Sequence, residues 1–189
     1  MKKRFRISYW LIVFFCLSLL IAPAGWAGQK IFVRIDGIPG DSVDECCRNW
    51  IVATSYSDGL SHPGNPSGGV NSPQPAVFDP VQITKSLDRA SPKLRQLAAP
   101  GGHIKEVTIE IRKPLGGETT VDRLVATFTL THCIITGVSL IVNETDLPKE
   151  VVTFDFGRIK GGYILWKPDG SSAGRIDFCW DREMNKSCL

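Results

Sequence analysis

The side chains of this sequence that could do acid–base chemistry are few and scattered. His103 and Glu106 lie three positions apart and could transfer a proton or hold a metal ion. Asp177 and Asp181 could form a carboxylate pair, although we expect both to be solvated near a strand end. A catalytic site needs several polar groups in fixed mutual geometry, so a hydrolase built on His103 or Asp177 is the weakest functional hypothesis.

Metal binding is also poorly supported. There is no Cys-x-x-Cys spacing, and His62, His103 and His132 are far apart in the sequence. His132 lies between the apolar Leu130 and Ile134, a pattern typical of a hydrogen-bonded core histidine rather than a ligand. We therefore expect neither a metal ion nor a cofactor.

The first 27 residues have the three parts of a secretory signal. Residues 1–6 carry four cations, residues 10–22 are apolar, and small residues occupy positions −3 and −1 of a cut after Ala27. The apolar run of about thirteen residues is shorter than the roughly 20 that a membrane-spanning helix needs. We expect a signal peptide over 1–27 and an exported mature domain over 28–189, periplasmic or secreted from a bacterium, without a stable membrane span.

Net charge excludes a strongly basic nucleic-acid-binding protein. The chain has 22 Lys and Arg against 19 Asp and Glu, a formal charge of +3. Four of the basic residues lie in the leader, so the rest of the chain is close to neutral.

Export changes how the cysteines are interpreted, because an oxidising compartment permits disulfides. Beyond the leader the chain has five cysteines, so at least one thiol stays free or pairs between chains. Bonding between the adjacent Cys46 and Cys47 would strain the backbone, so each is expected to pair elsewhere or to pack as a small apolar residue. We expect at least one disulfide, either Cys179–Cys188 or Cys47 with one of these two.

Alternation of apolar and polar residues predicts a mainly β fold. The fold class is a small β-barrel or sandwich of eight or nine strands with one short flanking α-helix. Turns are expected at Thr136-Gly137 and Gly161-Gly162, and Ile176, Phe178 and Trp180 are expected in the core. The strands are expected at 30–36, 49–56, 81–84, 105–112, 124–135, 138–142, 151–159, 163–166 and 175–180.

Two segments between the strands have distinct compositions. Ser91 is expected to cap a short helix that Pro92 begins and Pro100-Gly101-Gly102 ends. Residues 57–75 are so rich in glycine and proline that a long loop is expected there, and such loops are commonly functional or disordered.

Several short segments occur in an order that is informative as a whole. They are 32–42, 87–94 with its Ser-Pro helix start, 102–108 with His-Ile-Lys-Glu, 111–113, 154–159 and 179–181. Together they resemble the haemolysin-coregulated proteins, the Hcp family, which form the tube of type VI secretion. The resemblance covers about residues 30–188.

The resemblance implies a small β-barrel with one flanking helix, six copies of which form a ring that stacks into a tube. Such a protein is a non-catalytic structural subunit, and its partners are other copies of itself, effectors and the tip of the secretion apparatus. The family motifs implied to be structural contain Asp36, Gly37, Ser91, Pro92, His103, Lys105, Glu106, Trp180 and Asp181. The implied inter-subunit loop contains Ser57, Asp58, Gly59, Leu60, His62, Pro63, Asn65, Val70 and Pro75.

This chain departs from that family in its leader, because tube subunits assemble in the cytoplasm without a general export signal. An exported β-sandwich binding module that kept the fold without forming a tube is therefore the alternative to a ring component.

Overall fold

The computed structural model describes residues 28–63, 75–114 and 122–189. The expected signal peptide, Asn65 and Val70 lie outside these ranges. Within them, eight strands form one antiparallel sheet, accompanied by a 3-10 turn and a short helix, which confirms the predicted fold class. The elements are β1 (Lys30–Ile35), η2 (Glu45–Cys47), β2 (Ile51–Ser61), β3 (Val77–Ser86), α2 (Ser91–Ala98), β4 (His103–Pro114), β5 (Asp122–Ile141), β6 (Lys149–Trp166), β7 (Ser172–Asp181) and β8 (Lys186–Ser187).

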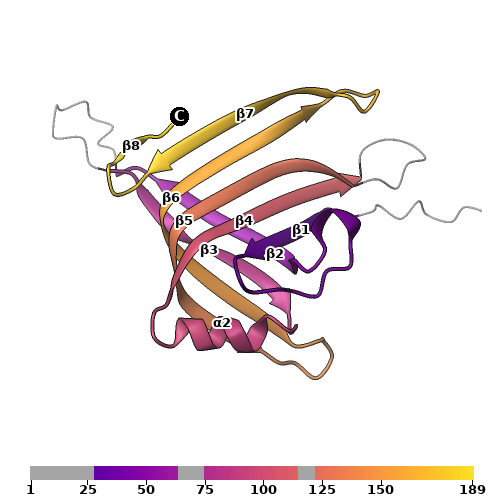
Figure 1. Ribbon diagram of the computed structural model, residues 1–189, viewed down its shortest axis with the longest axis vertical. Helices are drawn as coiled ribbons and strands as arrows, with labels where there is room; N and C mark the ends of the chain where they lie inside the picture. The colour runs from indigo at the N-terminus through magenta and orange to yellow at the C-terminus, as the bar shows by residue number, and fades with distance from the viewer. Residues whose placement is uncertain (1–27, 64–74, 115–121) are drawn as a thin grey trace, which may run out of the picture.

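The sheet closes on itself through six of its strands. The strand order is β3-β2-β1-β4-β5-β6-β7-β8, and an additional pairing of β3 with β6 makes a barrel. That pairing uses the first part of β6, from Lys149 to Phe154, while the part from Arg158 onward pairs with β7 instead. The sheet therefore continues past the closed barrel as an open extension (Figure 1). The extension consists of β7, the second half of β6 from Arg158 onward, and the first half of β5, which pairs with it.

Two predicted turns are in fact inside long strands. β5 runs through Thr136-Gly137 with only a local register shift, and β6 runs through Gly161-Gly162 without one on its β5 side. Gly161 and Gly162 are paired with both β5 and β7, and Gly137 is paired with β6, so cross-strand hydrogen bonds hold the backbone extended where the sequence alone indicates a break. The expected strands 124–135 with 138–142, and 151–159 with 163–166, are thus two strands instead of four.

The prediction that His132 is a core residue was also wrong. His132 has a φ of 56°, its side chain is exposed, and the buried side of β5 changes there from Leu130 to Cys133. On β6 the buried side changes at the same level, between Phe156 and Ile159. Apolar side chains on both sides of this change still fill one core inside the barrel.

The helix α2 follows its predicted bounds but begins differently. Pro92 lies in its first turn, and Gly101 and Gly102 donate hydrogen bonds to its last carbonyls. Ser91 is the first helical residue and not the N-cap, because its hydroxyl is buried against Lys85 and accepts a hydrogen bond from the Asp88 backbone N–H. The helix packs against β5 at the end of the barrel opposite β7 (Figure 1).

The expected long loop at 57–75 is partly regular. Residues Ser57 to Ser61, including Asp58, Gly59 and Leu60, belong to β2, which pairs with β3 through Leu60–Phe78 and Ser61–Val77. Alternation fails to reveal this extension because glycine and polar residues occupy it. His62, Pro63 and Pro75 are exposed beside it.

A disulfide between Cys179 and Cys188 ties the chain end to β7. This is one of the two pairings that the sequence leaves open. It excludes a bond of Cys47 with either of these two cysteines.

Removing this disulfide is expected to lower the free energy of unfolding. The bond closes a loop with a sequence separation of 9 residues, for which chain entropy gives about 2–3 kcal/mol. The double variant Cys179→Ala/Cys188→Ala should therefore unfold at a lower urea concentration than the parent chain, with an unchanged slope. Equal midpoints would mean that the cross-link adds nothing to stability.

Candidate functional site

An apolar face lies uncovered on the open extension of the sheet. We call it the β6–β7 face, and it consists of four side chains that are 38–62% exposed: Tyr163, Leu165, Ile176 and Phe178. Tyr163 pairs directly with Ile176 across the two strands. Because side chains alternate along a strand, Tyr163 and Leu165 point to the same side as the buried Ile159, which lies four and six positions before them on β6. Ile176 and Phe178 pair with Tyr163 and Gly161 and point to that side as well.

The β6–β7 face is therefore the continuation of the barrel core beyond the point where the barrel closes. Gly161 allows this, since the ring of Phe178 lies across it where any side chain would collide. The opposite side of β7 is polar, and Arg175 Nε lies 2.6 Å from an Asp177 carboxylate oxygen there. The prediction that Ile176 and Phe178 are core residues was thus right about the side of the sheet to which they point. It was wrong about their burial, because both are exposed in the single chain.

The outer edge of β7 is also open over most of its length. Among the described residues, β8 pairs only with the end of β7, through Trp180–Ser187 and Asp181–Lys186. The preceding residues of β7 present backbone donors and acceptors to solvent, and such an edge readily pairs with another chain. The strand β7 therefore has both an exposed apolar face and an unpaired edge.

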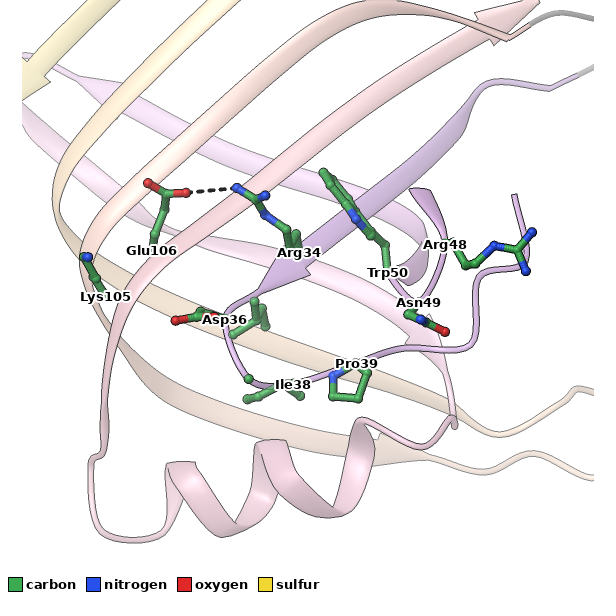
Figure 2. Close-up of a pocket in the computed structure, with 11 residues that line it drawn as sticks. Arg34, Asp36, Ile38, Pro39, Arg48, Asn49, Trp50, Lys105 and Glu106 are labelled. Atoms are coloured by element: carbon green, nitrogen blue, oxygen red, sulfur yellow. Dashed lines mark hydrogen bonds and ion pairs between the residues drawn. The ribbon is translucent and has the colours of Figure 1, made fainter. Parts of the chain in front are cut away.

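A groove of about 560 Å³ is formed by residues 34–39 and 48–50 together with β4. Figure 2 shows Arg34 at its centre, reaching toward Glu106 from β1. The guanidinium lies 3.2 Å from a Glu106 carboxylate oxygen and 5.4 Å from the centre of the Trp50 ring. Asp36, Gly37 and Lys105 also line the groove, which brings four of the expected motif residues together.

The groove holds charge and an aromatic ring but no arrangement of a base beside a nucleophile. Glu106 lines it, whereas His103 lines two other hollows, one beside His132 and Trp180 and one shared with Asp36 and Lys105. Asp177 pairs with Arg175 on the exposed side of β7. His103 and Glu106 thus do not line the same hollow, and neither lies with Asp177. Within the described ranges, no three His, Cys, Asp or Glu side chains gather as metal ligands would.

A buried ionic cluster connects α2 to the barrel. Lys85 is fully buried, and its Nζ donates to the Ser91 hydroxyl at 2.8 Å and lies 3.2 Å from Glu150 Oε2. The same nitrogen lies 2.8 Å from an Asp88 carboxylate oxygen. Glu150, which is equally buried, also pairs with Arg95 of α2 at 2.9 Å. The cluster thus gives the Ser-Pro helix start a physical role, which is to dock the helix through Ser91.

Sequence reasoning missed Lys85 and Glu150. The signal for them was their position in the alternation, since Lys85 continues the buried series Val81 and Ile83. Glu150 likewise precedes the buried Val152 on β6. A charged residue in phase with a buried series indicates a buried ion pair.

Asp181 is buried, against the expectation that it is solvated. Arg158 Nη2 lies 2.6 Å from its carboxylate, and the Met184 backbone N–H donates to the other oxygen at 2.9 Å. These two donors, the Met184 backbone N–H first, hold the pKa of the Asp181 carboxyl below its usual range. The terminal Trp-Asp motif therefore fixes the turn that leads to β8.

This lowered pKa predicts how Asp181 affects stability with pH. A carboxyl whose pKa is lower in the folded state stabilises the fold above its ordinary pKa of about 3.9, and that contribution is lost as pH falls through the folded pKa. Asp181→Asn should lower the melting temperature at pH 7, and its difference from the parent should shrink below about pH 4. Asp177→Asn is the control, because its exposed ion pair should contribute little at any pH. A difference for Asp181→Asn that is unchanged at pH 3 would contradict the assignment.

Comparison with known proteins places these features in context. Residues 32–163 match the family model described as "Type VI secretion system effector, Hcp". "Protein hcp1" of Pseudomonas aeruginosa is 29% identical over 159 residues, which cover 82% of this chain and 96% of that protein. The crystal structure of Hcp1 from Salmonella typhimurium is 25% identical, with a TM-score of 0.69, covering 84% of this chain and 98% of that one. A type VI secretion system effector from Yersinia pestis is 27% identical, with a TM-score of 0.64 and coverage of 80% and 98%.

Proposed function

Because this chain belongs to the Hcp family of structural tube proteins of type VI secretion, we propose that six copies of it close into a ring. In that ring the β6–β7 face of each subunit is covered by its neighbour. The observation that carries the proposal is that this face continues the barrel core and yet is 38–62% exposed in a single chain.

A closed ring with one rotation axis requires two different surfaces on each subunit, which meet head to tail. The β6–β7 face supplies the first, and contiguous apolar surface of this kind marks protein interaction sites. The β2–β3 hairpin supplies a candidate for the second, because Leu60 and Val77 near its end are also exposed apolar side chains. This hairpin leads into residues 62–75, which we propose to contact a neighbouring subunit or ring.

We further propose that the protein is exported through its leader, residues 1–27, and acts without catalysis. In the part of the chain that the structure describes, no helix combines the length and the apolar character needed to span a membrane. Rings of this kind would stack into a tube that carries effector proteins. The divided positions of His103, Glu106 and Asp177 support a structural rather than an enzymatic role.

Native mass measurement of residues 28–189 tests the ring. The expected species is a hexamer at micromolar concentration, which dissociates on dilution. A strict monomer at the highest attainable concentration would contradict the proposal and would favour the alternative, an exported binding module whose β6–β7 face binds a different protein.

A further inference from the structure

Two adjacent cysteines lie in the 3-10 turn η2, and their sulfur atoms are close together. The Sγ atoms of Cys46 and Cys47 are 2.6 Å apart, about 0.6 Å more than a disulfide bond. Cys46 is exposed and Cys47 is fully buried. The backbone of the turn is fixed from both sides, since the Cys47 N–H donates to Asp44 and its carbonyl accepts from Trp50.

The remaining cysteines are not available to either thiol. Cys179 and Cys188 are bonded to each other, and Cys133 is buried in the barrel core. The buried Cys47 thiol has one further polar neighbour, a Glu110 carboxylate oxygen at 3.7 Å. Glu110 is already held by Arg112, with 2.8 Å between the charged atoms.

We propose that Cys46 and Cys47 form a disulfide with each other, so that η2 is a reversible oxidation site. Its formation requires no movement of β-strands and leaves the Glu110–Arg112 pair intact. The assignment revises the expectation that adjacent cysteines avoid one another, and it is independent of ring formation.

The oxidant is the disulfide of another molecule, either a small-molecule disulfide or a thiol–disulfide exchange protein. The exposed Cys46, as the thiolate, attacks one sulfur of that disulfide, forms a mixed disulfide and releases one thiol. Cys47 then loses its proton to solvent and attacks the Cys46 sulfur, which releases the second thiol. Two cysteine thiols are oxidised and one external disulfide is reduced to two thiols, so electrons and protons balance.

Burial raises the pKa of the Cys47 thiol far above its usual range, so the second step of bond formation is the slow one. The lability of the bond, once formed, comes from its geometry. Neighbouring Cα atoms are about 3.8 Å apart, whereas disulfides usually join Cα atoms about 4.4–6.8 Å apart, so the bond between neighbours stores strain. The Cys46–Cys47 bond should therefore open at a lower dithiothreitol concentration than Cys179–Cys188.

Opening and closing of this bond would affect the groove in Figure 2 directly. Arg48, Asn49 and Trp50 follow the pair in sequence and line that groove. A closed bond fixes the turn from which these residues project.

The test counts thiols in residues 28–189 after oxidation with oxidised glutathione, denaturation and alkylation without reductant. One alkyl label per chain is expected, on Cys133. The tryptic peptide of residues 35–48 contains both cysteines of η2, and it should be unlabelled and two hydrogen masses lighter than its dithiol form. Three labels, or a cross-linked dimer on a non-reducing gel, would overturn the assignment.

Two variants complete the test. Cys46→Ser should gain one label, because it frees Cys47, and Cys133→Ser should lose the single remaining label while the 35–48 peptide stays unlabelled. In a dithiothreitol titration, opening of Cys179–Cys188 before the pair in η2 would refute the labile character of the bond. None of these outcomes depends on whether the chain is a hexamer.

Discussion

Replacing Ile176 with aspartate is expected to convert the ring into single subunits. Ile176 is 62% exposed in one chain, so the substitution should leave the fold of the subunit nearly unchanged. In the ring its side chain would be buried, which is worth about 1.5–3 kcal/mol for isoleucine. Since every 1.4 kcal/mol or so is a tenfold change in affinity, each interface should weaken by about ten- to a hundredfold, and the ring repeats this loss at every interface.

The measurement is molar mass by light scattering over a range of concentrations, with circular dichroism to verify the fold. Leu147→Asp is the matched control, because Leu147 is 76% exposed in the turn between β5 and β6, away from the β6–β7 face. The control should remain hexameric. If Ile176→Asp also remained hexameric, the β6–β7 face would not be the covered surface.

Replacing Lys85 with methionine is expected to destabilise the subunit strongly. The substitution keeps the length of the side chain but removes the charge that contacts Glu150, Asp88 and Ser91. Breaking a buried ion pair by removing one partner leaves uncompensated charge, which costs about 3–5 kcal/mol. This is a large part of the total stability of a typical domain, about 5–15 kcal/mol.

Guanidinium unfolding should be measured in the Ile176→Asp background, because assembly otherwise adds to apparent stability. Lys149→Met is the matched control, since Lys149 pairs with Asp146 at 3.1 Å on the exposed surface and such pairs contribute about 0.2–1 kcal/mol. The loss of stability in Glu150→Gln should lie between those of Lys85→Met and Lys149→Met, because Lys85 would keep its contacts with Asp88 and Ser91. If Lys85→Met changed stability no more than Lys149→Met, the cluster would not hold the helix in place.

Alternation in the sequence predicts most of the strands, because every second side chain fills one core. It fails where a neighbouring strand overrides a local signal. Turns are predicted at Gly137 and at Gly161 and Gly162. The backbone stays extended there, because Gly137 pairs with β6 while Gly161 and Gly162 pair with both β5 and β7. His132 has a positive φ, which changes the buried side of β5 without leaving a trace in the composition.

The candidate site was less predictable for a different reason. A strand that is covered within its own chain and a strand whose apolar side is exposed have the same apolar alternation, so the sequence predicts that Ile176 and Phe178 lie in the interior. Charged residues of the cluster were missed because Lys85 and Glu150 lie 65 positions apart and meet only when β3 pairs with β6. Ser91 was identified from its helix start, but its true partner was not.

The continuity of β5 and β6 has a mechanical consequence. Both strands pass from the closed barrel into the open extension while paired with each other, and β5 is also paired with β4 at the level where the outer partner of β6 changes from β3 to β7. The extension is therefore joined to the barrel by continuous sheet. Each subunit would then enter its assembly as a rigid unit, with the angle between barrel and extension already set. Little conformational freedom would then remain to be lost on docking, and the bore of any tube would be set by the curvature of one protomer rather than by what travels inside it.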